Sequence, residues 1–134
     1  MNQLINTKKL ESVWYGPPTE LAPTLVFLHE GLGCVSLWKD FPKKLAEKTG
    51  CGALVFSRLG YGKSNPCILP RALDFMHHEA ISELPEILLQ KNICKHILVG
   101  HSDGASIALI NAAEKPSEYL LGIVNEAPHV FCEQ

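Results

Sequence analysis

The sequence predicts a single α/β domain over residues 1–134, built on a mostly parallel sheet. Short apolar runs rich in strand-forming residues alternate with segments whose apolar residues recur at helical spacing. This alternation favours parallel strands joined by right-handed helical crossovers. The apolar runs also lack polar alternation, as expected of strands that helices cover on both faces. Active groups are then expected at the carboxyl ends of the strands.

The expected elements follow in order along the chain. The predicted strands are an edge strand over residues 10–15 and further strands over 24–29, 53–56, 96–99 and 120–125. The predicted helices cover residues 38–49, 73–91 and 105–115. Gly50 ends the first helix and Pro116 stops the third, whereas Pro85 inside the second predicts a kink or a late start.

The most informative stretch is Gly100-His101-Ser102-Asp103-Gly104, which lies between the predicted strand over 96–99 and the helix that follows. Glycine at both outer positions lets a strand and a helix pass close together at a sharp turn. Such a turn strains the serine, exposes its Oγ and directs free helix N–H groups at whatever Oγ attacks. A second interpretation is that Ser102 only caps the helix.

Three segments resemble the α/β hydrolase family. They are His29-Glu30-Gly31-Leu32-Gly33, Gly60-Tyr61-Gly62-Lys63-Ser64 and the turn over residues 100–104. The likeness runs from about residue 10 to 133 and corresponds to the N-terminal half of such an enzyme. Two departures are visible: Glu30 stands where the family usually has glycine, and Arg58 is shifted by one position from the family's arginine.

The resemblance implies acyl transfer to water from a small-molecule carbonyl substrate, such as an ester, thioester, amide or lactone. Ser102 would be the nucleophile, and Gly100, His101 and Gly104 would shape its turn. The resemblance also implies an oxyanion hole formed by the N–H of Asp103 and a second N–H from Gly31 or Leu32. Losing one such donor typically costs about 3 kcal/mol of barrier.

The family places its catalytic acid and then its histidine in strand ends beyond the strand over 120–125. We therefore expect a sheet truncated after that strand, in a fragment, a frame-shifted product or a degenerate copy. Within the sequence, His129 and Glu126 are the candidate stand-in base and acid, because both follow the last predicted strand. That strand would lie at the sheet edge, which predicts self-association or pairing with a separate chain carrying the C-terminal half.

Two other function classes remain open. A non-enzymatic remnant or binding module would keep the turn and the oxyanion hole without chemistry. A nucleotide binder is suggested by residues 57–64, which differ from a P-loop only in having Ser57 in place of the first glycine. In a P-loop, a helix must begin at the lysine and serine, here Lys63 and Ser64.

Composition narrows the remaining classes. The net charge is −2, no basic block suggests nucleic acid, and no apolar run approaches the length of a membrane span. Residues 1–9 have no long apolar stretch, so no signal peptide is expected. The five cysteines form no C-x-x-C pair and have no zinc spacing, which predicts a reduced, cytoplasmic chain. No metal or organic cofactor is implied.

Overall fold

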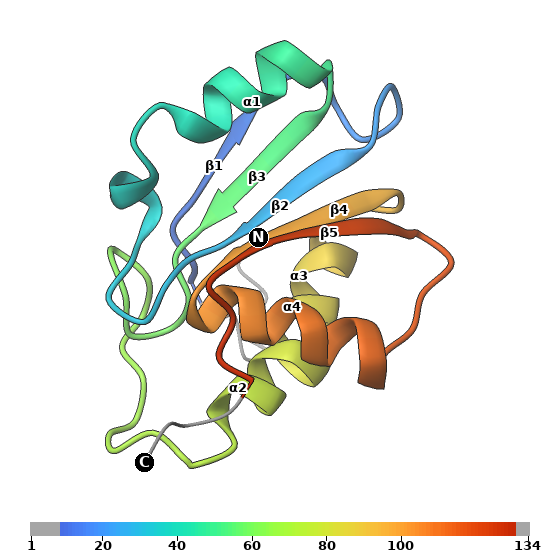
Figure 1. Ribbon diagram of the computed structural model, residues 1–134. Helices are drawn as coiled ribbons and strands as arrows, with labels where there is room; N and C mark the ends of the chain where they lie inside the picture. Colours follow the sequence, from blue (N-terminus) through green and yellow to red (C-terminus); the bar gives the residue numbers. More distant parts are fainter. Residues whose placement is uncertain (1–8, 131–134) are drawn as a thin grey trace.

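The computed structural model describes residues 9–130 and contains one five-stranded sheet (Figure 1). The strands are β1 (Ser12–Tyr15), β2 (Thr24–Leu28), β3 (Gly52–Phe56), β4 (His96–His101) and β5 (Leu120–Glu126). They lie in the order β1-β3-β2-β4-β5; β1 pairs antiparallel with β3, and all other pairs are parallel. The predicted α/β class with a mostly parallel sheet is confirmed.

Helices cover both faces of this sheet. They are a 3-10 turn η1 (Val35–Trp38), α1 (Phe41–Thr49), α2 (Phe75–His78), a π-helical segment η2 (Glu79–Glu83), α3 (Leu84–Gln90) and α4 (Asp103–Glu114). Helix α1 lies on one face and helices α2 to α4 lie on the other (Figure 1). All residues of β2 and β3 are buried, as the continuous apolar runs predicted, and their side chains alternate between the two core layers.

The first predicted helix differs from the structure at its start. Trp38 lies in η1, and α1 begins only at Phe41, with Pro42 in its first turn. Proline fits there because the first N–H groups of a helix have no intrahelical partner. Trp38 still packs on the sheet, with its ring edge-on to Phe27 at a centroid distance of 5.1 Å. Helix α1 ends at Gly50 with φ of 72°, as its glycine predicted.

The long helix predicted over residues 73–91 is formed by α2, η2 and α3 in succession. Pro85 lacks the N–H that would bond the carbonyl of Ile81, so the regular helical ladder cannot continue there. The structure widens to a π-helix over Glu79–Glu83, just before this proline. The expected irregularity thus takes the form of a π-helical segment.

The register of the sheet brings the carboxyl ends of three strands together. Leu28 of β2 lies opposite Gly100 of β4, which lies opposite Asn125 of β5. The residues that follow these strands are therefore neighbours in space, although they lie up to a hundred positions apart in sequence. The candidate active site lies at these carboxyl ends.

Strand β5 lies at the end of the sheet, as predicted for the strand over 120–125. Within residues 9–130 it pairs only with β4. Leu121 and Val124 are 52% and 60% exposed. An apolar strand with one free edge is a ready site for pairing with another strand.

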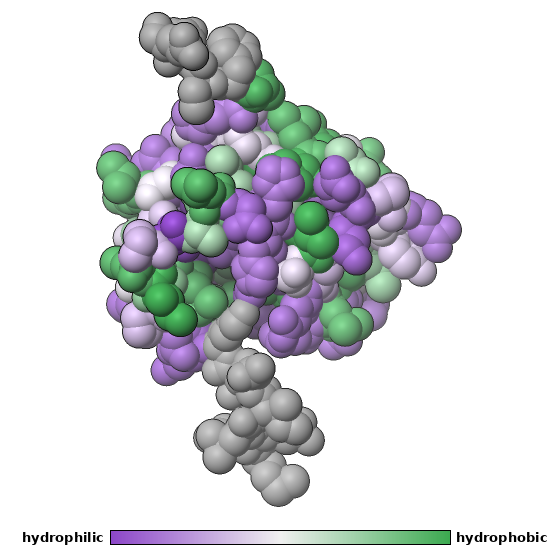
Figure 2. All heavy atoms as spheres, turned by 90° about the horizontal axis from the view of Figure 1, so that it is seen from below, coloured by the Kyte–Doolittle hydropathy of each residue, from purple (hydrophilic) through white to green (hydrophobic). Residues whose placement is uncertain are grey.

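The described residues contain no helix that is both long and apolar enough to cross a membrane. Figure 2 shows hydrophilic and hydrophobic residues interspersed on the face seen from below. Cys34, Cys51, Cys67 and Cys94 are free thiols. The sequence predictions that concern residues 1–8 and Cys132 lie outside the described residues.

Candidate active site

Ser102 lies at a sharp turn between β4 and α4. Its φ of 53° and ψ of −116° are strained for a residue with a side chain. The Ser102 N–H donates to the carbonyl of Glu126 at 2.9 Å, and its carbonyl accepts the N–H of Ser106 at 3.1 Å. Bonds to β5 on one side and α4 on the other thus hold the strained turn in place.

The two glycines of the turn are required by close backbone contacts. A Cβ at Gly104 would overlap the Leu28 carbonyl of β2. A Cβ at Gly100 would lie 2.6 Å from the Cα of Ala105. Both are closer than real Cβ atoms approach, so the strand and the helix can pass each other only without side chains here. His101, between Gly100 and Ser102, instead lines a small cavity of about 120 Å³ together with His29 and Trp38.

His129 lies directly over the serine. The Ser102 Oγ and the His129 Nε2 are 2.7 Å apart. The His129 N–H donates to the Ser106 Oγ at 2.8 Å, and that hydroxyl donates to the His129 carbonyl at 3.1 Å. Ser106 lies one helical turn after Ser102 on α4 and is buried. The Ser106 hydroxyl therefore anchors the backbone of the histidine beside the serine.

Sequence reasoning missed Ser106. Its only signal was the spacing of four residues from Ser102, which places both side chains on one face of α4. The position of His129 after the last predicted strand made it the candidate base for Ser102, but no pattern paired its backbone with Ser106.

Glu126, the predicted stand-in acid, and Asp103 differ in what they reach. The Asp103 Oδ1 lies 3.7 Å from the His129 Nε2, the same nitrogen that meets Ser102. An acid that orients a catalytic histidine must hold the opposite nitrogen, Nδ1. Glu126 meets Ser102 through its backbone carbonyl. Among residues 9–130, the carboxylate close to His129 is that of Asp103, not that of Glu126.

The loop after β2 approaches the turn at Gly31. A Cβ there would lie 2.6 Å from the Asp103 Oδ2, so the Gly31 backbone passes beside the first residue of α4. Asp103 is also where the unpaired N–H groups of that helix begin. Leu32, the next residue, is 87% exposed. Gly31, one of the two candidates for a second oxyanion donor, thus lies next to Asp103.

His29 and Arg58 hold this loop. The Nδ1–H of His29 donates to the Glu30 carbonyl at 2.7 Å, and Nε2 accepts the Arg58 N–H at 2.9 Å. The buried Arg58 guanidinium in turn donates to the His29 carbonyl. Burial, followed by the positive charge of Arg58, lowers the pKa of His29 to about 4. A neutral His29 and an arginine shifted from the family position thus serve as loop supports.

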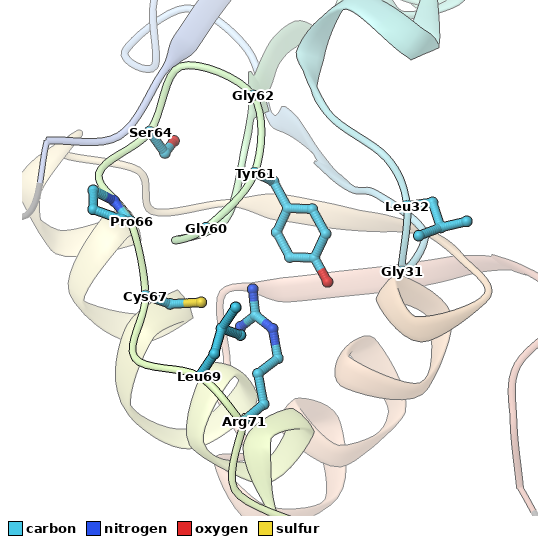
Figure 3. A pocket seen from close by; sticks show the side chains of 10 residues that line it. All are labelled: Gly31, Leu32, Gly60, Tyr61, Gly62, Ser64, Pro66, Cys67, Leu69 and Arg71. Carbon is cyan, nitrogen blue, oxygen red and sulfur yellow. The ribbon is translucent and has the colours of Figure 1, made fainter.

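A cavity of about 490 Å³ adjoins the loop at Gly31 (Figure 3). Its walls come from the loop after β2 and from the segment between β3 and α2. They are formed by Gly31, Leu32, Gly60, Tyr61, Gly62, Ser64, Pro66, Cys67, Leu69 and Arg71. Ser102 does not line this cavity. Gly31 lines it and also lies beside Asp103, the residue that follows Ser102. The volume lies within the range of small-molecule sites.

The structure bears on metal binding and on the nucleotide-binding alternative. Residues 9–130 contain no group of three or more His, Cys, Asp or Glu side chains that could hold a metal ion. The P-loop alternative needs a helix beginning at Lys63 and Ser64, but the next helix, α2, begins at Phe75. The Ser64 Oγ donates instead to the Ser57 carbonyl. The nucleotide-binding alternative therefore lacks its structural requirement.

Comparison with known proteins adds sequence relatives. Residues 25–132 match the model of the "Alpha/beta hydrolase family". The sn-1-specific diacylglycerol lipase ABHD11 of Danio rerio is 32% identical over 93 residues, which are 69% of this chain and 28% of that protein. Its Xenopus laevis counterpart is 32% identical over 114 residues, 82% of this chain and 35% of that protein. The chain thus spans about a third of the length of these relatives.

Solved structures show the same fold. A monoacylglycerol lipase of Paleococcus ferrophilus superposes with a TM-score of 0.70 and 26% identity, covering 90% of this chain and 43% of that one. An esterase from Exiguobacterium antarcticum gives a TM-score of 0.75 at 19% identity, covering 97% of this chain and 46% of that one. The sheet and helices described above therefore correspond to somewhat less than half of each of these structures.

Proposed function

This chain belongs to the alpha/beta hydrolase family, and from that membership we propose that it hydrolyses esters or related carbonyl compounds with Ser102 as nucleophile. The observation that carries the proposal is the 2.7 Å contact between the Ser102 Oγ and the His129 Nε2 at a strained turn. A serine hydroxyl becomes a good nucleophile only with a base at such a distance.

The proposed reaction has two steps. The Ser102 Oγ attacks the substrate carbonyl while His129 Nε2 takes the hydroxyl proton. The carbon–oxygen bond of the ester then breaks, and the histidine returns the proton to the departing alkoxide. Water attacks the acyl-serine in the same way, with His129 again as base, which releases the acid and restores Ser102.

The negative charge that develops on the carbonyl oxygen needs donors. We assign these to the N–H groups of Asp103 and Gly31, supported by the close approach of the Gly31 backbone to the start of α4. The Asp103 carboxylate lies at the rim of this site. It is placed to stabilise a protonated His129 from the Nε2 side, because the two groups are 3.7 Å apart.

Labelling with a fluorophosphonate probe tests the nucleophile. We expect Ser102 to be modified in the wild-type chain and the Ser102→Ala variant to be unlabelled. Ser82→Ala is the matched control, because Ser82 is exposed on the long helix, away from the turn. Equal labelling of the wild-type and Ser102→Ala chains would overturn the proposal. Hydrolysis of 4-nitrophenyl butyrate should follow the same pattern.

A binding module is the second candidate function. It is favoured by one observation: within residues 9–130, Asp103 reaches His129 on Nε2, and no carboxylate is placed on Nδ1 as a catalytic triad requires. In a binding module, Ser102→Ala would leave ligand affinity unchanged and the wild type would show no probe labelling. The labelling experiment therefore discriminates between the two functions.

We also propose that the free edge of β5 pairs with a further strand, from a second copy or from a separate chain carrying the C-terminal half. The support is the apolar, half-exposed character of this edge strand. Light scattering coupled to size exclusion should show an assembly larger than the monomer. A well-folded monomer would contradict self-association, and co-expression with the C-terminal half would then test the other partner.

A further inference from the structure

The cavity of about 490 Å³ carries a positive charge that the proposed chemistry does not use. Figure 3 shows the Arg71 guanidinium and the Tyr61 hydroxyl directed toward each other inside it. Arg71 is the one residue among its lining residues that is charged at neutral pH; the others are apolar, small or neutral polar. A ligand in this cavity would therefore meet an arginine and no carboxylate from the lining.

The position of Arg71 is well defined. Its guanidinium carbon lies 4.7 Å from the ring centroid of Tyr61 and 5.8 Å from that of Phe75. One of its N–H groups donates to the Leu59 carbonyl at 2.7 Å. Aromatic stacking and one fixed hydrogen bond limit the rotamers of the side chain, which lowers the entropic cost of ligand binding. Among residues 9–130, the remaining donors of the guanidinium fork form no hydrogen bond.

The charge of Arg71 lacks a close counter-ion. Within residues 9–130, no carboxylate oxygen lies within 4.0 Å of its guanidinium. The nearby acidic group is Glu79, which interacts electrostatically with both Arg58 and Arg71. Glu79 is buried and lines a neighbouring cavity next to α2, which Arg71, Asp74 and Glu83 also line. These carboxylates lie on the side of the neighbouring cavity, whereas the lining of the larger cavity contains Arg71 and no carboxylate.

The place of this charge relative to the nucleophile limits what it can bind. Gly31 lines the cavity and also lies against Asp103, the residue after Ser102. A substrate whose carbonyl lies at Ser102 can therefore extend past Gly31 into the cavity. A carboxylate on the extended part would meet the guanidinium, which suits planar two-oxygen groups.

We propose that the substrate is a carbonyl compound carrying a free carboxylate, such as the half-ester of a dicarboxylic acid, and that Arg71 is the specificity-determining residue that binds this carboxylate. The proposal rests on the hydrolase function proposed above. Tyr61 contributes a second donor through its hydroxyl. Neutral acylglycerols, the substrate class in the names of the diacylglycerol lipases similar to this chain, would leave the arginine without a carboxylate partner.

Binding to the Ser102→Ala variant tests the carboxylate site without turnover. We expect calorimetry to detect monomethyl glutarate and to find dimethyl glutarate bound about 10- to 100-fold more weakly, as expected for loss of a charge-assisted hydrogen-bonded pair. Adding Arg71→Gln should remove that difference, and Arg71→Lys should retain part of it. Lys63→Gln is the matched control, because Lys63 is an exposed cation of the neighbouring loop that does not line the cavity. Equal affinity for both esters, or no effect of Arg71→Gln, would overturn the proposal.

Hydrolysis provides the second readout. With mono-4-nitrophenyl glutarate and 4-nitrophenyl butyrate, we expect Arg71→Gln to raise KM for the charged ester alone. Arg71-dependent binding without Ser102-dependent hydrolysis would refute the proposed function and leave the carboxylate site standing. Ser102-dependent hydrolysis that Arg71→Gln leaves unchanged would support the proposed hydrolase function and refute the carboxylate site. If circular dichroism shows that Arg71→Gln is unfolded, Arg71→Lys takes its place. The preference for the charged ester over the neutral one is then compared between Arg71→Lys and the chain with native Arg71.

Discussion

His29 and His129 both follow carboxyl ends of strands in this sheet, yet their surroundings are opposite. His29 is 2% exposed, and both of its ring nitrogens have backbone partners. The His129 side chain is 57% exposed, and its Nε2 faces the Ser102 hydroxyl. Burial and occupied nitrogens suit a structural support, whereas an accessible nitrogen beside a hydroxyl suits proton transfer. The comparison teaches that partners and burial, more than residue type, decide what a histidine does.

The largest expected effect concerns the exposed histidine. His129→Ala should lower kcat by about 10²- to 10⁴-fold, because it removes the proposed general base. The melting temperature should change little, since the side chain is largely exposed. Steady-state kinetics with 4-nitrophenyl butyrate measures the first effect and calorimetry the second. An unchanged kcat would show that His129 is not the general base, and its proposed functional difference from His29 would then be wrong.

The buried histidine should show the reverse pattern. His29→Ala leaves the Glu30 carbonyl and the Arg58 N–H without their partner and creates a cavity. We expect the free energy of unfolding to fall by about 3–4 kcal/mol. Urea denaturation measures this loss, with His77→Ala on the exposed side of the long helix as control. A stable His29→Ala variant would show that the loop is held by other contacts.

The burial of His29 should also make the stability of the protein depend on pH. The pKa of His29 is lowered by burial from 6.5 to about 4, so the unfolded chain binds the proton more readily than the folded one between these values. The contribution of neutral His29 is complete above pH 6.5 and is lost as the pH falls through about 4, by an amount on the order of 3 kcal/mol. His29→Gln should flatten this part of the urea-denaturation profile. A wild-type profile that matches that of His29→Gln would contradict the assignment.

The smallest effect concerns the anchor of His129. Ser106→Ala removes both hydrogen bonds to the His129 backbone. We expect kcat to fall about tenfold, equivalent to about 1.4 kcal/mol, because the base is less well placed. Ser106→Thr keeps the hydroxyl and should restore part of the rate. A loss of rate in Ser106→Ala that Ser106→Thr does not reverse would point to packing within α4 rather than to the hydrogen bonds.

Most of the fold was predictable because its signals are local. The buried strands β2 and β3 appear as continuous apolar runs, and Gly50 marks the end of α1. Where the predicted helices differ from those of the structure, the local effect of a proline accounts for the difference. Pro42 favoured a helix start at Phe41, and Pro85 is preceded by a π-helical segment.

The sequence by itself determined the α/β class, the strand–turn–helix around Ser102 and the need for glycine at Gly100 and Gly104, because these depend on residues close together in the chain. Tertiary structure alone decided which residues meet there. The return of the segment after β5 places His129 on Ser102, and Ser106 anchors it. The packing of the segment after β3 places Arg71 on Tyr61 and Arg58 on His29. These contacts join residues about 10 to 30 positions apart, and no local pattern encodes the sheet register and loop packing that bring them together.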